Sequence, residues 1–311
     1  MIDYLRISLT NLCNLNCIYC NPFKRRENLQ GDCVLSPEEI EKIVKVFSLL
    51  GVNKVRLTGG EPLLRKDIMD VVFRIKSIKG IKKILLTTNG VLLKDFISEL
   101  KNADIYEVNV SLDTLKKDKF LKITGRDELK RVLEGIDEAI KSGFQLKINT
   151  VLFKGINDDE IPDFIRYFRD KGVYLRFIEY SSTSKEFKIY ENIGVREEEV
   201  KNVIKKHFGI LETVDYRTNG PSIYYKLEGF RGLIGFISGK SRDFCSLCNR
   251  VRISQDGKLF LCLYSDECFD LRRILEMDIG DAMNSLRKIL AKKRSYKNDR
   301  KREFYMVSIG G

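Results

Sequence analysis

The feature that most constrains this chain is a group of three cysteines within eight residues, directly after a short apolar segment at residues 4–9. Cys13, Cys17 and Cys20 follow a C-x3-C-x2-C spacing, which is too tight for a loop-rich disulfide framework. A loop this short can direct three thiolates at one inorganic cluster, and thiolates are the usual ligands of iron–sulfur clusters. Three protein ligands leave one iron of a four-iron cluster open to a small molecule. Tyr19, just before the last cysteine, is placed to pack beside that molecule.

The alternative is a zinc knuckle or a set of buried thiols. A structural zinc site takes four ligands, usually cysteine together with histidine. The only histidine is His207, far away in the sequence, so zinc at this loop would need Cys33 or a more distant cysteine. We therefore favour an iron–sulfur cluster and keep zinc as the alternative.

Length, composition and charge narrow the class of protein. A chain of 311 residues allows one large domain, or one large and one small. No run of about 18 apolar residues predicts a membrane span, and the first residues lack the basic and apolar regions of a signal peptide. Eight cysteines without an export signal indicate a reducing compartment, so we expect a cytoplasmic protein. The net charge of +12 suits an anionic partner, either a polyphosphate nucleotide or nucleic acid.

One pattern repeats from residue 4 to about residue 179: a short β-branched run, a loop and an amphipathic helix. The predicted strands are residues 5–9, 54–58, 83–88, 106–111, 145–152 and 174–178. Most are apolar runs rather than strict alternations, as expected for parallel strands covered on both faces. A capping box at Ser36 starts the first helix, and further helices are predicted at residues 68–75, 130–142 and 161–171. Six such units in series predict an α/β fold, a partial (βα)6 barrel of the TIM type.

In such barrels ligands bind at the C-terminal ends of the strands. Every candidate motif is predicted to lie there, and the glycine pair allows a close approach of the backbone to a ligand. The candidates on the second to sixth strands are Gly59, Gly60, Glu61, Thr87, Ser111, Lys147 and Arg176.

The chain changes character from about residue 210. Short segments at residues 222–227 and 233–238, separated by glycines, predict a small antiparallel sheet. We place the boundary loosely around residues 180–210. The prediction is a barrel over residues 1–190 and a small C-terminal α+β domain over residues 191–311.

A second set of three cysteines lies in this C-terminal part. Cys245 and Cys248 are followed by Cys262 after thirteen intervening residues. The Asp256-Gly257 pair between them is a hairpin turn signal that would fold Cys262 back toward the other two. A second four-iron cluster fits this set, whereas zinc would need Cys268.

Two arginines stand beside the second cysteine set. Arg250 and Arg252 alternate, so on a strand both face the same side, where two guanidiniums make a fork for phosphate. The alternative is a pair of solvated surface arginines. The basic stretch at residues 287–302 would suit nucleic acid, but it reads better as the solvated face and tail of a last helix. The final Gly310-Gly311 is either a frayed end or a segment thin enough to enter a narrow site.

Taken together, these motifs resemble the GTP 3′,8-cyclase family of the radical S-adenosylmethionine (SAM) superfamily, which begins molybdenum-cofactor biosynthesis. The matching stretches are residues 4–10, 55–63, 86–90, 108–113, 176–179, 244–263 and 309–311. Two positions depart from the family pattern: Asn21 stands where methionine is usual, and Ser181-Ser182 stands where Met-Pro is usual. Neither departure removes a cysteine.

The resemblance implies two [4Fe-4S] clusters, one with SAM on Cys13, Cys17 and Cys20, the other on Cys245, Cys248 and Cys262. It implies SAM contacts at Tyr19, Gly59, Gly60, Glu61 and Ser111. The implied GTP contacts are Arg6, Lys54, Arg56, Thr87, Lys147, Arg176, Arg250 and Arg252, and the last two count as catalytic together with the first three cysteines. The guanine would bind the open iron of the second cluster, and the Gly310-Gly311 tail would reach the active site.

The implied activity is that of a lyase that converts GTP to (8S)-3′,8-cyclo-7,8-dihydroguanosine 5′-triphosphate. The runner-up is a radical SAM peptide or protein maturase with an auxiliary cluster. From a different class, a zinc-binding basic nucleic-acid module is the third reading. The expected partners are GTP, SAM, an electron donor and a downstream cyclic pyranopterin monophosphate synthase. A homodimer is considered beside a monomer, and neither a membrane nor nucleic acid is expected.

Overall fold

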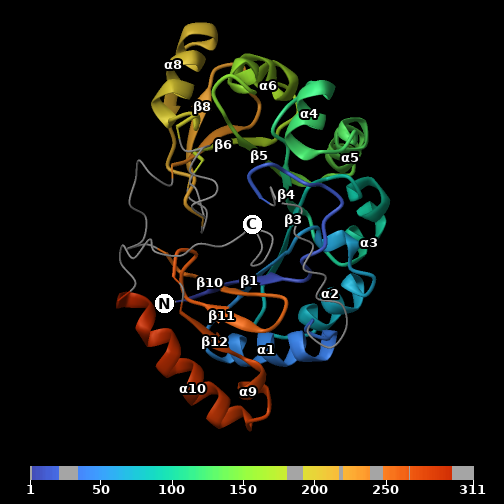
Figure 1. The fold of residues 1–311 in the computed structure, drawn as a ribbon, viewed down its shortest axis with the longest axis vertical. Coiled ribbons are helices and arrows are strands. Elements are labelled where there is room, and N and C mark those ends of the chain that lie inside the picture. The colour runs from blue at the N-terminus through green and yellow to red at the C-terminus, as the bar shows by residue number, and fades with distance from the viewer. Residues whose placement is uncertain are drawn as a thin grey trace.

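The computed structural model describes residues 2–20, 34–180, 192–216, 220–238, 248–265 and 267–295. One sheet of twelve strands organises them, in the order β12-β11-β10-β1-β2-β3-β4-β5-β6-β9-β8-β7. The helices lie around the outside of the curved sheet (Figure 1). The six central strands are parallel and follow one another in sequence: β1 (Tyr4–Ser8), β2 (Lys54–Thr58), β3 (Lys83–Thr88), β4 (Glu107–Ser111), β5 (Gln145–Val151) and β6 (Tyr174–Ile178).

The predicted α/β architecture is confirmed, and each of the six predicted strands starts and ends within one residue of its prediction. The predicted helices correspond to α1 (Pro37–Leu49), α2 (Ile68–Lys76), α5 (Leu129–Lys141) and α6 (Ile161–Phe168). Two short helices that we did not predict, α3 (Ile97–Asn102) and α4 (Lys117–Thr124), complete the outer layer beside β3 and β4.

The strands alternate, so the expectation of apolar runs covered on both faces is wrong. Leu5, Val55 and Leu146 point to the helix side and are fully buried in the apolar core. Every second side chain, such as Arg6 and Lys147, instead lines a cavity inside the curved sheet. Closed TIM barrels fill this space with branched apolar side chains. Because the interior here is a polar cavity, only the helix-facing side of the sheet is apolar.

The C-terminal strands extend the barrel sheet and do not form a sheet of their own. β8 (Ile223–Leu227) and β9 (Leu233–Ile237) pair antiparallel as predicted, but β9 also pairs in parallel with β6. At the opposite end, β10 (Arg250–Ile253) pairs in parallel with β1. The remaining elements are β7 (Leu211–Thr213), β11 (Lys258–Phe260), β12 (Cys268–Asp270), α8 (Glu197–Phe208), α9 (Arg272–Leu275) and α10 (Ile279–Ala291). The division of the chain near residue 190 stays a prediction.

The turn between β10 and β11 is the predicted hairpin turn. Gly257 adopts φ +85° there, a left-handed conformation that favours glycine. The two strands it joins are antiparallel, with Arg252 opposite Phe260. This turn brings the chain back beside the start of β10.

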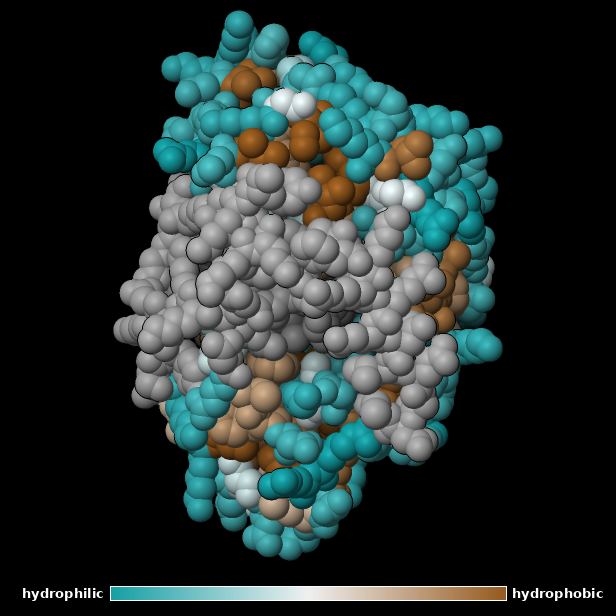
Figure 2. All heavy atoms as spheres, in the orientation of Figure 1, coloured by the Kyte–Doolittle hydropathy of each residue, from teal (hydrophilic) through white to brown (hydrophobic). Residues whose placement is uncertain are grey.

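The surface on the face shown in Figure 2 is hydrophilic around most of its rim, with hydrophobic side chains in smaller groups. In the described parts of the chain, no helix is long and apolar enough to cross a membrane.

The start of α1 gives a test of the fold. The Ser36 hydroxyl accepts a hydrogen bond from the Glu39 amide at 3.2 Å, and the Glu39 carboxylate accepts one from the Ser36 amide at 2.7 Å. We expect Ser36→Ala to lower the free energy of unfolding by about 1 kcal/mol, because one helix amide loses its partner. Urea unfolding of the metal-free protein measures this change. Ser36→Thr, which keeps the hydroxyl, is the control, and equal urea midpoints for Ser36→Ala and wild type would contradict the prediction.

Candidate active site

A cavity of about 830 Å³ occupies the inside of the curved sheet. Alternate side chains of β1 to β6 and of β10 form its walls, because side chains two residues apart on a strand share one face. The strand register sets which of them are neighbours. Arg6 on β1 lies opposite Arg56 on β2 and Arg252 on β10, so the cavity wall carries three guanidiniums in one row.

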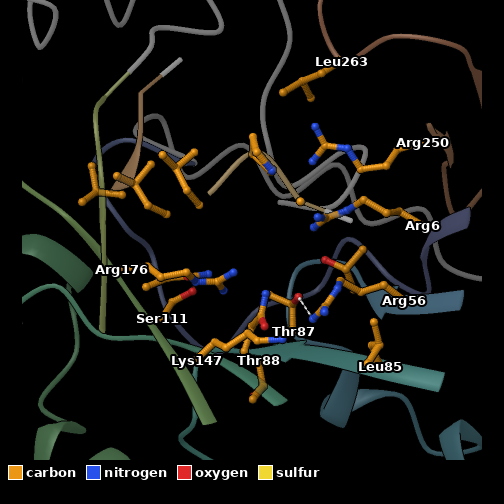
Figure 3. Close-up of a pocket in the computed structure, with 18 of the residues that line it drawn as sticks. Arg6, Arg56, Leu85, Thr87, Thr88, Ser111, Lys147, Arg176, Arg250 and Leu263 are labelled. Carbon is orange, nitrogen blue, oxygen red and sulfur yellow. Dashed lines mark hydrogen bonds between the residues drawn. The ribbon is translucent and has the colours of Figure 1, made fainter. Parts of the chain in front are cut away.

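The predicted GTP contacts all lie on this wall. Figure 3 shows Arg6 and Arg250 reaching into the cavity from one side and Arg176 from the other. Eight basic side chains line the wall. One of them is Lys83, and we call the other seven, which are the basic residues among the predicted GTP contacts, the cation belt: Arg6, Lys54, Arg56, Lys147, Arg176, Arg250 and Arg252. Thr87 lies on the same wall.

The buried cations of the belt disfavour one another. Burial, followed by the charge of Arg252, lowers the pKa of Arg6 well below its usual value. Burial and then Arg250 lower the pKa of Arg252 to about 10. Burial also lowers the pKa of Arg176, and Nε and one terminal nitrogen of this side chain have no hydrogen-bond partner among the described residues. Buried cations that disfavour one another bind an anion favourably, so the belt is suited to a polyphosphate.

Two members of the belt are held by neighbours that sequence reasoning missed. Arg56 donates to the Tyr4 hydroxyl, to the Leu86 carbonyl at 2.9 Å and to the Thr87 hydroxyl at 3.2 Å (Figure 3). Lys147 donates to Glu107 at 3.1 Å. Tyr4 and Glu107 stand at cavity-facing positions of β1 and β4. The alternation of these strands was the signal that would have found them.

The cysteine loop after β1 is fixed by backbone contacts. The Asn16 amide donates to Thr124 at 2.8 Å and the Ile18 amide donates to Ile123 at 2.9 Å, both at the end of α4. The Asn89 side chain donates to Asn14 at 2.7 Å. The loop is therefore anchored on both sides of Cys17, and the predicted ligands Cys13, Cys17 and Cys20 all line the cavity.

Gly59 and Gly60 pack closely against the backbone of this loop. A Cβ atom on Gly60 would lie 2.2 Å from the Leu12 carbonyl oxygen, and one on Gly59 would lie 2.6 Å from that of Thr10. The Gly60 amide donates to Thr10 at 2.7 Å. We expected the glycines to admit a ligand; the close approach in the structure is to the backbone of the cysteine loop. Both glycines also line the cavity.

Tyr19 and Ser111 lie where a molecule bound at the loop would meet them. Both line the cavity, and the Tyr19 hydroxyl donates to Asp113 at 2.5 Å. The second oxygen of Asp113 accepts from the Val151 amide at 2.8 Å. Burial raises the pKa of Asp113 to about 6. The Tyr19 ring is thereby fixed against Phe153, with 5.7 Å between the ring centroids.

The Glu61 side chain is not on the cavity wall, and its SAM contact stays a prediction. Its side chain is fully buried. One carboxylate oxygen accepts from the Thr88 hydroxyl at 2.8 Å and the Leu63 amide at 3.1 Å, and the other accepts from the Asn89 amide at 2.7 Å. Glu61 therefore connects the loops after β2 and β3. Asn89 extends this connection to the cysteine loop through its hydrogen bond with Asn14.

The thiols of the first set are strongly affected by burial. Burial raises the pKa of Cys13 to about 11, and burial followed by the charge of the neighbouring Cys20 raises that of Cys17 well above its usual value. Bound metal would compensate the thiolate charge, as metal sites do in general. Within the described residues, no three such ligands lie close enough for one metal ion. A four-iron cluster is larger and binds each thiolate on a different iron.

The two described cysteines of the second set, Cys248 and Cys262, lie at the other end of the cavity. Cys248 precedes β10, which runs parallel to β1, and Cys262 follows the antiparallel β11, so both stand near the N-terminal ends of the central strands. Both line the cavity. Burial by itself raises the pKa of Cys248, but the charges of Arg250 and Lys293 bring it below its usual value. The motifs that we predicted at the C-terminal edge belong to the six barrel strands, and Cys248 and Cys262 lie at the opposite edge.

Several predicted features lie outside the described residues. They are Asn21, Cys33, Ser181-Ser182, Cys245 and Gly310-Gly311. Cys268 is described, and it is exposed on β12.

Three features define the class of protein as a radical SAM enzyme. They are the partial parallel barrel, the cysteine loop after its first strand and the cavity that this loop lines. The family model of the Radical SAM superfamily matches residues 7–168, and the model "Molybdenum Cofactor Synthesis C" matches residues 173–303. Two structures of SuiB from Streptococcus suis share the fold. One has a TM-score of 0.66 and 16% identity, covering 96% of this chain and 68% of that chain. The other, bound to S-adenosylmethionine, has a TM-score of 0.64 and 17% identity, covering 90% of this chain and 65% of that chain.

Relatives at higher identity specify the family. A GTP 3′,8-cyclase of Thermodesulfovibrio yellowstonii is 44% identical over 293 residues, 94% of this chain and 90% of that protein. One of Clostridium perfringens is 41% identical over 323 residues, 100% of this chain and 98% of that protein. The chain belongs to the GTP 3′,8-cyclase family of the radical SAM superfamily.

The packing of Gly60 predicts a loss of metal. In Gly60→Ala the new methyl group would displace the backbone at Leu12, so we expect the affinity of the reconstituted protein for iron to fall by about tenfold or more. The iron content per chain after reconstitution measures this loss of iron. Gly143→Ala is the control, because a Cβ added at Gly143 has no atom within 4 Å, although Gly143, unlike Gly60, has a positive φ of +86°. Equal iron contents in the two variants would contradict the prediction.

Glu61 predicts a pH dependence of stability. Burial raises the pKa of Glu61 to about 7 from 4.5, so its favourable contribution is complete below about pH 4.5 and is lost as the pH rises through about 7. The difference corresponds to about 3 kcal/mol. We expect Glu61→Gln to flatten the fall in unfolding free energy between these pH values in metal-free protein. Exposed Glu99→Gln on α3 is the control, and parallel pH curves for wild type and Glu61→Gln would refute the idea.

Proposed function

We propose that this protein cyclises GTP to (8S)-3′,8-cyclo-7,8-dihydroguanosine 5′-triphosphate, a step of molybdenum-cofactor biosynthesis. One observation carries the proposal: a single cavity has the first cysteine loop at one end, two cysteines of the second set at the other and the cation belt between them. Such a cavity suits two cofactor-sized ligands, one of which is a polyanion. Its volume of about 830 Å³ lies in the upper part of the usual range for ligand sites.

The bound groups would supply the radical chemistry. A four-iron cluster held by Cys13, Cys17 and Cys20 would supply the electron for reductive cleavage of SAM, with methionine as the leaving group. The deoxyadenosyl part of SAM would then accept hydrogen from ribose carbon 3′, which would allow this carbon to bond to carbon 8 of guanine. The protein's part is to hold the reactants in one pose, because a primary radical reacts with whatever lies nearest. The anchored loop fixes Cys13, Cys17 and Cys20, while Tyr19 and Ser111 border the space for SAM.

The cation belt would bind the triphosphate. Arginine pairs with phosphate through two parallel hydrogen bonds, and the row of Arg6, Arg56 and Arg252 offers three such groups side by side. Arg56 is already oriented by Tyr4 and Thr87. Release of the repulsion within the belt adds to the free energy of binding.

We further propose a second [4Fe-4S] cluster on Cys245, Cys248 and Cys262, with the guanine at its open iron. The peptide maturase alternative has the same fold, but the relatives at 40% identity or more carry cyclase names. These relatives also speak against the zinc-binding nucleic-acid module. A cytoplasmic location, an electron donor, a homodimer and a downstream synthase that receives the product stay predictions.

The decisive experiment is an anaerobic incubation of reconstituted protein with dithionite, SAM and GTP, followed by mass spectrometry. We expect 5′-deoxyadenosine together with a GTP isomer of unchanged mass. If SAM is cleaved while GTP stays intact, the substrate is wrong. If neither changes in fully iron-loaded protein, the radical chemistry is wrong.

If the cation belt binds GTP, a change in the belt should affect the conversion of GTP more than the cleavage of SAM. Arg252→Gln removes a charged donor, so we expect the conversion of GTP to fall by about ten- to hundredfold while the cleavage of SAM persists. Arg74→Gln is the control, since Arg74 pairs with Glu38, Glu41 and Asp70 on the surface of the helices. An Arg252→Gln enzyme that converts GTP at the wild-type rate would exclude a role of this side chain in binding.

A further inference from the structure

A lysine from the end of the chain's last described helix reaches the second cysteine set. α10 is followed by a short 3-10 turn, Lys292–Ser295. The Lys293 ammonium donates to the Leu261 carbonyl at 2.6 Å and lies 3.6 Å from Sγ of Cys248. Leu261 directly precedes Cys262. One ammonium group therefore bridges the two cysteine segments that β10 and β11 bring together.

Lys293 differs from the lysine beside it. Lys292 pairs with Glu267 at 3.2 Å, and both side chains are about half exposed, at 53% and 45%. Lys293 instead points to a carbonyl of a fully buried residue and to a thiol. An ammonium that gives up part of its hydration in this way needs those acceptors, and a thiolate that binds metal would be the stronger acceptor of the two.

The position of Lys293 separates it from the substrate. Arg250 also acts on Cys248, but Arg250 lines the cavity and belongs to the cation belt. Among the described residues that line the cavity, Lys293 is absent. Lys293 comes from the outer layer, where α10 packs on α1 and lies at the β10–β12 end of the molecule (Figure 1). It can therefore influence a cluster without contacting GTP.

Charge and hydrogen bonds at the ligand sulfur set the potential of an iron–sulfur cluster. One-electron reduction adds a negative charge to the cluster, and a cation held at the ligand stabilises that charge more than it stabilises the oxidised form. We propose that Lys293 is a positioning residue for the second cysteine set: it holds Cys248 and the segment before Cys262 together and raises the reduction potential of a cluster bound there. This inference rests on the second cluster of the proposed function.

The test measures the second cluster alone. All samples are the full chain with Cys13, Cys17 and Cys20 replaced by alanine, reconstituted anaerobically, and iron per chain and the midpoint potential from an EPR-monitored redox titration are recorded. In this background we compare Lys293→Met, which removes the charge, Lys293→Arg, which keeps it, and Lys292→Met as the matched control. We expect Lys293→Met to shift the reduction equilibrium at least tenfold toward the oxidised cluster, about 59 mV for one electron. Lys293→Arg and Lys292→Met should stay near the parent.

The outcomes separate the two proposals. A parent sample without iron overturns the second cluster and this inference with it. A parent with iron and a Lys293→Met potential equal to that of the parent overturns the inference alone. If Lys293→Met binds no cluster, Lys293→Arg decides: iron restored by arginine supports the role of the charge, and iron absent from both overturns it. Thermal unfolding of each variant shows whether the fold itself has changed.

Discussion

The pairing of β1 with β2 on one side and β10 on the other is the constraint on which the rest of this molecule depends. It places Arg6 between Arg56 and Arg252 in one register row. Residues 6 and 252 thereby face the same cavity although most of the chain lies between them. The same parallel pairing fixes the direction of β10, so Cys248 and Cys262 lie at the opposite end of the cavity from the first cysteine set.

A row of buried guanidiniums works against folding. Each cation loses hydration, and their charges raise one another's energy, as the lowered pKa values of Arg6 and Arg252 indicate. The stabilising free energy has to come from the other face of the sheet, where the apolar side chains of the strands pack on the helices. Because one face of the sheet packs on the helices and the other lines the cavity, apolar and polar side chains alternate along the strands. A bound anion would bring compensating negative charge to these cations.

The cysteine loop is held by hydrogen bonds and close packing on both sides. Its backbone is hydrogen-bonded to the end of α4 on one side and packed on Gly59 and Gly60 on the other. Glu61 connects the same glycine turn to Asn89. Functional groups on loops depend on such rigid support, and here the support comes from the loops after β2 and β3, which the curved sheet brings beside the first.

The sequence by itself determined the local elements and the chemistry. Local interactions between residues close in the chain determine the capping box at Ser36, the six strands and the cysteine spacing. These features could therefore be predicted from the sequence. Tertiary structure alone decided that Gly60 serves the backbone at Leu12, that Glu61 is buried away from the cavity, and that Lys293 reaches Cys248. It also decided that the C-terminal strands join both ends of one sheet. These features depend on which distant segments become neighbours. The register between strands determines much of this, and no local sequence pattern specifies that register.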